Sequence, residues 1–171
     1  GNYSLIIQGP STATITAKSL SMSGLSVPTS KVYDGTTVAV ITDARALHPA
    51  EAALTGSAID GIPYTGDTVN FTGTAVGTYN HKDVGTATTV TYTGLGLDNS
   101  NYSLLMQSPS NATISPKALT ISGLSSQDKV YDRSTAATVN GAAALQTSEA
   151  PGAGSTSDGV AYNGDDVSLT G

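Results

Sequence analysis

The chain has 171 residues, a formal net charge of −6, no cysteine and no tryptophan. Disulfide bonds therefore cannot stabilise it, and its single phenylalanine and eight tyrosines supply all of its aromatic side chains. It carries no Lys/Arg cluster, and no apolar run approaches the roughly 20 residues of a membrane-spanning helix. We therefore expect no nucleic-acid partner and no membrane insertion.

An internal repeat divides the chain. Asn2-Tyr3-Ser4-Leu5 returns as Asn101-Tyr102-Ser103-Leu104, and Lys18 returns 99 positions later as Lys117. A period of about 99 residues is too long for a solenoid coil and fits one small domain per copy. We predict that residues 1–17 are the C-terminal strands of a preceding repeat, that residues 18–116 form one complete repeat, and that residues 117–171 are the N-terminal part of a following repeat.

Apolar residues alternate with hydroxyl residues at matching places in the copies. The pattern covers residues 13–15, 20–23, 69–71 and 88–93, and it recurs over residues 112–114, 119–122 and 167–169. This period of two predicts short strands with one buried face. We expect an all-β fold of tandem Ig-like antiparallel β-sandwich repeats. Because only Lys18 or Lys117 separates one strand from the next at each boundary, neighbouring repeats should be joined with little free linker.

The best-matched segment is Lys31-Val32-Tyr33-Asp34-Gly35, which returns 98 positions later as Lys129-Val130-Tyr131-Asp132-Arg133. We interpret it as a structural motif in which the tyrosine packs across the end of the sandwich and the aspartate caps backbone N–H groups of the next turn. Arg133 replaces Gly35, so we interpret the glycine as a preference and not a requirement.

Between these motifs lies a stretch that differs between the copies. Residues 48–54 could begin a short helix with Pro49 in its first turn, whereas residues 146–157 are rich in Gly, Ser and Pro. We take residues 45–58 and 146–157 as a variable loop. A second pair of motifs follows it, and each places a glycine where a tight turn requires positive φ: Tyr64-Thr65-Gly66-Asp67 and Tyr162-Asn163-Gly164-Asp165.

Taken together, these motifs resemble one known family. The matching segments are Lys31 to Thr37, Gly66 to Val69, Val84-Gly85-Thr86, Asn101 to Leu104 and Ala112 to Lys117. They resemble the YDG repeats of filamentous-haemagglutinin-like bacterial exoproteins and adhesins. The resemblance implies a chain exported to the surface of a Gram-negative bacterium, and it covers nearly the whole sequence.

Two kinds of binding site are alternatives to a structural role for these motifs. A tyrosine beside a carboxylate, as in Tyr33-Asp34, could bind a sugar. Five aspartates in turn-like segments of an acidic chain are candidate calcium ligands, although no Asp-x-Asp-x-Asp-Gly loop groups them: Asp34, Asp60, Asp67, Asp83 and Asp98. The structural role is favoured for both, so we expect no cofactor, with calcium as the alternative.

The function expected from the resemblance is a non-catalytic structural stalk or spacer segment of a large secreted bacterial surface adhesin. Neither His48 nor His81 recurs in the other copy and no cysteine nucleophile exists, so we expect no enzyme. One alternative is a self-assembling extracellular filament or biofilm-matrix protein that uses strand exchange or lateral association. Another is a glycan- or receptor-binding module. The expected partners are neighbouring repeats of the same chain and, for the filament, other copies of it.

Overall fold

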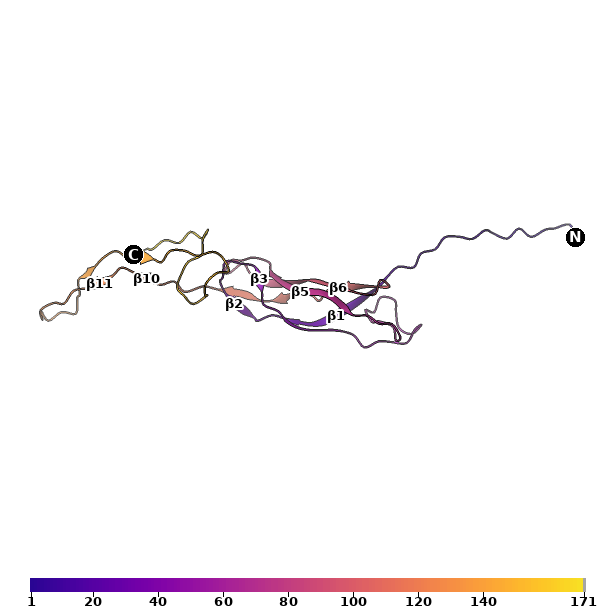
Figure 1. The fold of residues 1–171 in the computed structure, drawn as a ribbon, viewed down its shortest axis with the longest axis horizontal. Coiled ribbons are helices and arrows are strands. Elements are labelled where there is room, and N and C mark those ends of the chain that lie inside the picture. The colour runs from indigo at the N-terminus through magenta and orange to yellow at the C-terminus, as the bar shows by residue number, and fades with distance from the viewer. Residues whose placement is uncertain (171) are drawn as a thin grey trace. The chain divides into compact units, whose positions relative to one another are not determined.

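The computed structural model describes residues 1–170 and is built of strands (Figure 1). The described residues contain no helix, and therefore no helix that is long and apolar enough to cross a membrane. The strands of the complete repeat are β1 (Lys18–Ser26), β2 (Ser30–Val32), β3 (Val38–Ala39), β4 (Thr42–Leu47), β5 (Phe71–Tyr79), β6 (Thr89–Leu97), β7 (Tyr102–Leu105), β8 (Ser110–Asn111) and β9 (Thr113–Ser115). Four short strands follow: β10 (Ile121–Ser122), β11 (Ser125–Ser126), β12 (Val139–Asn140) and β13 (Ala144–Leu145).

The sheets combine antiparallel and parallel pairs, which corrects the prediction of an antiparallel fold. One sheet has the order β4-β1-β7, a second has the order β3-β5-β6-β8, and β2 pairs with β9. The β1–β7 and β2–β9 pairs are parallel, with Lys18 opposite Tyr102 and Lys31 opposite Ile114. Parallel neighbours need long connections, and each of these pairs is joined by most of the repeat. Alternation marks which face of a strand is buried, but it does not fix the direction of its neighbour.

Contacts between residues divide the chain into two compact units, which we describe separately. The first contains residues 1–24, 44–74 and 94–107. Its core is formed around β1 and β7, where Leu20, Met22 and Tyr102 are buried. The predicted alternation over residues 20–23 is confirmed in β1, since Leu20 and Met22 are buried whereas Ser21 is half-buried and Ser23 is exposed.

The second unit contains residues 25–43, 75–93 and 108–170. Val90 and Tyr92 of β6 are buried, as their alternation predicted, and they share this core with Tyr79 of β5 and Ile114 of β9. Antiparallel pairs join β3 to β5 and β6 to β8. The same unit holds the start of the next repeat, in which β10 pairs with β13 and β11 with β12.

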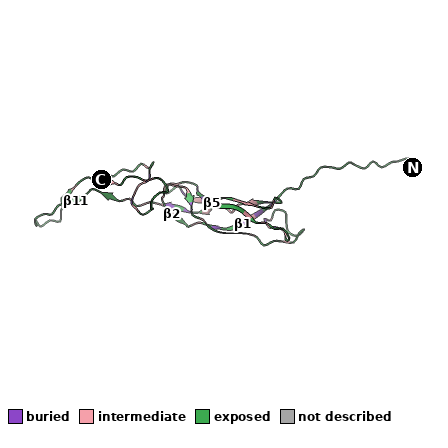
Figure 2. Ribbon diagram, viewed as in Figure 1, coloured by how far each residue is buried: buried purple, intermediate pink, exposed green. Residues whose placement is uncertain are grey.

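Burial is uneven along the chain (Figure 2). Residues 1–17 are all exposed and form no strand, and Figure 1 draws them as an extended trace. Val167 and Leu169, predicted as a strand, are also exposed and unpaired in the described chain. Val69 precedes the start of β5 at Phe71. The alternating pattern by itself therefore does not decide whether a segment pairs as a strand.

Candidate functional site

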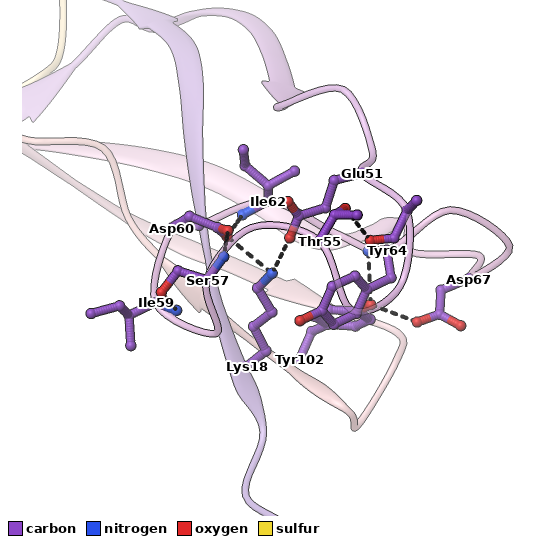
Figure 3. Close-up of polar contacts among 12 residues, drawn as sticks. Lys18, Glu51, Thr55, Ser57, Ile59, Asp60, Ile62, Tyr64, Asp67 and Tyr102 are labelled. Carbon is purple, nitrogen blue, oxygen red and sulfur yellow. Dashed lines mark hydrogen bonds and ion pairs between the residues drawn. The ribbon is translucent and has the colours of Figure 1, made fainter.

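A lysine at the start of β1 lies at the centre of a polar cluster in the first unit (Figure 3). Only 8% of the Lys18 side chain is exposed. Its Nζ lies 2.8 Å from Oε1 of Glu51 and 2.9 Å from Oδ1 of Asp60. The same nitrogen sits 4.0 Å from the centroid of the Tyr64 ring. A buried ammonium is tolerated here because two carboxylates and an aromatic face replace its water shell.

The loop between β4 and β5 positions both carboxylates. Asp60 accepts hydrogen bonds from the backbone N–H of Ser57 at 2.7 Å and of Ile62 at 3.0 Å. Glu51 is fixed through its backbone, which accepts from Thr65 N–H and donates to the Pro63 carbonyl. Gly56 lets the loop fold tightly over Glu51, because a Cβ at this position would clash with Glu51 Oε2.

The cluster favours the charged forms of Lys18 and Asp60. Burial alone would lower the pKa of Lys18, but its hydrogen bonds to Glu51 and Asp60 raise that pKa above its ordinary value. The Ile62 N–H and Lys18 together hold the pKa of Asp60 well below its usual range. An amide bond between the Lys18 and Asp60 side chains would need the lysine amine to be neutral. The raised pKa of Lys18 opposes that neutral state.

Tyr102 of β7 connects the cluster to the Tyr64–Asp67 turn. Its hydroxyl accepts from Tyr64 N–H at 3.1 Å and donates to Oδ2 of Asp67. Burial and the nearby Asp67 raise the pKa of Tyr102. Gly66 has a φ of 99°, the positive value that the turn was expected to need.

The lysine cluster recurs in the second unit. Lys117 Nζ lies 2.8 Å from Glu149 Oε1 and 2.9 Å from Asp158 Oδ1, and it sits 4.0 Å from the Tyr162 ring centroid. Burial lowers the pKa of Lys117, but the two carboxylates more than compensate and raise it. Lys117, then the Val160 N–H, hold the pKa of Asp158 far below normal.

This second cluster corrects the interpretation of residues 45–58 and 146–157 as a variable loop. Glu51 and Glu149 are 98 positions apart, the same spacing as Tyr33 and Tyr131, and this was the signal that sequence reasoning missed. The possible helix over residues 48–54 does not form either. Glu51 instead makes a parallel bridge to Tyr64, as Glu149 does to Tyr162. Its backbone groups are therefore committed to another strand and not to a helical turn.

The Lys31–Gly35 motif forms a turn in which Lys31 and Asp34 bind each other and the backbone of the next few residues. Oδ1 of Asp34 accepts from the backbone N–H of Thr36 at 2.9 Å, and Lys31 Nζ lies 2.7 Å from the same oxygen. Lys31 also donates to the carbonyls of Thr36 and Val38, both at 2.9 Å. Burial favours protonation of Asp34, but these donors outweigh it and lower its pKa. The second copy repeats the turn, with Lys129 Nζ 2.9 Å from Asp132 Oδ1.

Tyr33 points away from this turn and contacts the next repeat. Its hydroxyl donates to Oδ1 of Asp165 at 2.9 Å and accepts from Lys82 Nζ at 3.0 Å. Its ring meets the Tyr162 ring edge to face, with centroids 5.8 Å apart. Burial, and then Asp165, raise the pKa of Tyr33 against the opposing effect of Lys82. The two predicted motifs, Lys31–Gly35 and Tyr162–Asp165, are thus brought together across a repeat boundary.

A second contact crosses the same boundary one residue further on. The N–H of Gly152 donates to the carbonyl of Asp34 at 2.8 Å. Gly35 has a φ of 74°, and a Cβ there would lie 2.8 Å from the Pro151 Cβ. In the second copy Arg133 adopts a φ of 64° and is exposed, so this turn accepts a side chain in that conformation. At position 35 the neighbouring Pro151 leaves little room for a side chain, so packing as well as φ favours the glycine there. We call the contacts of Tyr33, Asp34 and Gly35 with Pro151, Gly152, Tyr162 and Asp165 the repeat junction.

The five candidate calcium ligands do not converge. Asp34 pairs with Lys31, Asp60 with Lys18 and Asp83 with Lys82, while Asp67 accepts from Tyr102 and Asp98 from Asn70. Over residues 1–170 no three His, Asp or Glu side chains gather into a possible metal site. Each of these aspartates has at least one carboxylate oxygen within hydrogen-bond distance of a donor of the chain itself.

Comparison with known proteins gives one match. The model of the YDG domain family matches residues 16–112, a stretch that holds the Lys18 cluster and the Lys31–Gly35 turn. No curated protein and no solved structure matches the chain.

Proposed function

Because the chain belongs to the YDG domain family, we propose that it is a non-catalytic spacer segment, in which Ig-like repeats are strung in tandem along the stalk of a large secreted bacterial surface adhesin. The observation that carries the proposal is the repeat junction. Tyr33 reaches across the boundary to Asp165, and the Asp34 carbonyl accepts from Gly152 on the other side. A spacer needs such contacts because a flexible joint would not hold its two ends apart.

The boundary itself supports a stiff connection. Strand β9 ends at Ser115, and Lys117 is already inside the next lysine cluster, so Pro116 alone connects them. Proline fixes its own φ and restricts the residue before it. A one-residue linker between two anchored segments has little freedom to swing.

The repeated lysine clusters and the Lys31–Gly35 turn fit a structural role. The Lys18 and Lys117 clusters tie one strand to one loop in each copy, and the Lys31–Gly35 turn presents Tyr33 to the following repeat. Because stability in such arrays is a sum over repeats and their interfaces, a device copied into every repeat fits a structural role. The proposed partners are therefore neighbouring repeats, and the proposed location is the bacterial surface.

Electron microscopy of the purified full-length parent protein tests the proposal. Rods whose length rises in proportion to the number of repeats would support a stalk. Compact particles, or beads that are freely jointed at every boundary, would contradict it.

A self-assembling filament is the second candidate, and one observation favours it. Apolar side chains near the N-terminus are almost fully exposed, among them Tyr3, Leu5 and Ile15. Such side chains in an extended segment are typical of a strand that pairs with another chain.

A further inference from the structure

The loop of the repeat junction carries a glycine at a position where the first copy of the loop carries a leucine. Gly152 has a φ of 75°, and Leu54, which stands 98 positions earlier, has a φ of 65°. The loop therefore folds with either residue in the left-handed region, although a leucine is strained there. Backbone conformation alone does not decide which of the two residues this position carries.

At Gly152 the nearest group of the neighbouring repeat is a methyl group. A Cβ added at Gly152 would lie 3.3 Å from Cγ2 of Thr36. Apart from the chain neighbours of Gly152, no other heavy atom of the described residues comes within 4 Å of that position. The Gly152 N–H donates to the Asp34 carbonyl at 2.8 Å, so the loop cannot retreat without losing this hydrogen bond. A side chain at position 152 therefore meets Thr36 first.

The methyl group of Thr36 is held in place by the hydroxyl on the same carbon. Oγ1 donates to Oδ1 of Asp34 at 3.0 Å and accepts from the Val38 N–H at 3.3 Å. Lys31 Nζ donates to the same hydroxyl oxygen at 3.3 Å. Rotation about χ1 would move the methyl group away from Gly152 only by breaking these hydrogen bonds.

The second copy of the turn keeps its polar contacts without this methyl group. Ser134 takes the place of Thr36, 98 positions further on. Its Oγ accepts from Lys129 Nζ at 2.7 Å, and its N–H donates to Oδ1 of Asp132 at 2.9 Å. Serine therefore builds the same turn, and the turn itself does not need the methyl group of Thr36.

We propose that the residues at positions 36 and 152 decide which repeats can be direct neighbours. A threonine turn, as at Thr36, accepts a loop with glycine, as at Gly152. A serine turn, as at Ser134, also accepts a loop with a side chain, as at Leu54. By this rule the complete repeat, which carries Thr36 and Leu54, is a poor neighbour for a second copy of itself. The inference rests on the repeat junction of the proposed spacer and adds to it the class of repeat that each turn binds.

Hydrogen exchange at the amide of residue 152 in the intact chain tests the rule. Gly152→Leu places the residue of the first loop in the second loop, and it should lower protection at that amide at least about tenfold. Thr36→Ser removes the methyl group and keeps the hydroxyl, so in this background Gly152→Leu should have an effect at least about threefold smaller. The strain of a leucine at positive φ is the same in both backgrounds and cancels in this double-mutant cycle.

Ser134→Thr is the matched control, because it adds the same methyl group to the second copy of the turn. It should leave the effect of Gly152→Leu unchanged within about twofold. The amide of Glu149, which donates to the Ala161 carbonyl at 2.9 Å, reports whether the loop itself stays folded. We expect this amide to keep its protection in every variant.

Three results would contradict the account. An effect of Gly152→Leu that is equal with and without Thr36→Ser would overturn the proposal. Loss of protection at Glu149 together with residue 152 would also overturn it, because the cost would then lie within the loop. An unprotected amide at residue 152 in the unaltered chain would overturn the repeat junction itself, and the spacer role with it, so the two failures are distinguishable.

Discussion

Replacement of Gly35 by alanine tests the repeat junction at its tightest point. The new Cβ would lie 2.8 Å from the Pro151 Cβ and 3.2 Å from its Cα. Both atoms belong to a proline ring or to backbone, so neither can rotate away. The loop that carries Gly152 must therefore move, and its hydrogen bond to the Asp34 carbonyl must lengthen or break.

The expected cost has two parts. An L-residue in the left-handed region costs roughly 1–2 kcal/mol, of which about 0.4–1 kcal/mol is returned by a less flexible unfolded chain. Overpacking against Pro151 adds about 1–3 kcal/mol. We expect Gly35→Ala to destabilise the junction by about 2–4 kcal/mol, with most of the cost coming from the clash.

Hydrogen exchange at the Gly152 amide measures this loss of stability at the repeat junction itself. A loss of about 2–4 kcal/mol lowers protection at that amide by roughly 30- to 1,000-fold when exchange proceeds through local opening. Arg133→Ala is the matched control, because Arg133 has a φ of 64° in the equivalent turn. It should change the protection of Gly152 by less than about threefold.

A double-mutant cycle separates the clash from the backbone term. Pro151→Gly removes the nearest atom, so the double variant should recover about 1–3 kcal/mol relative to the sum of the single changes. Unchanged protection in Gly35→Ala, or strictly additive effects in the cycle, would refute the packing of Gly35 against Pro151.

Three further predictions concern the polar contacts. Tyr33→Phe should lower the free energy of unfolding by about 1 kcal/mol in urea titration followed by circular dichroism. Asp165→Ala should cost less in that background than in the unaltered chain, since the Tyr33–Asp165 hydrogen bond is already absent. Because the pKa of Asp60 and Asp158 is lowered in the folded state and that of Lys18 and Lys117 is raised, their stabilising effect is present from about pH 5 to pH 10. The thermal midpoint should thus fall as acid protonates the aspartates below about pH 4 or as base neutralises the lysines, and a midpoint that rises on acidification would contradict this sign. Intact mass should equal that of the unmodified sequence, because Lys18 and Asp60 are stabilised as ions; loss of one water per cluster would show an amide bond instead.

Local sequence patterns predicted the parts of the fold that local forces decide. Alternation in residues 20–23 and 88–93 anticipated β1 and β6, since period two follows from the pleat. The glycine of Tyr64-Thr65-Gly66-Asp67 anticipated a positive φ, because the turn permits few alternatives. Strands and turns that depend on interactions between neighbouring residues can therefore be predicted from a single sequence.

Long-range pairing was not predictable in the same way. Nothing near Tyr33 indicates that its hydroxyl bonds to Asp165, 132 positions away. The parallel direction of β7 beside β1 depends on the whole course of the repeat between them. Glu51 was the exception, because comparison of the two copies could have paired it with Glu149. The residues around Glu51 and Glu149 differ between the copies, which hides this correspondence.

The measurement that tests the stiff junction most directly is a distance across it. Spin labels at Thr78→Cys and Thr156→Cys, both exposed and on opposite sides of the boundary, can be introduced because the chain has no other cysteine. Double electron–electron resonance should give one narrow distance distribution that broadens when Gly35→Ala is added. A broad distribution in the otherwise unaltered chain, with no response to Gly35→Ala, would contradict a spacer built from directly packed repeats.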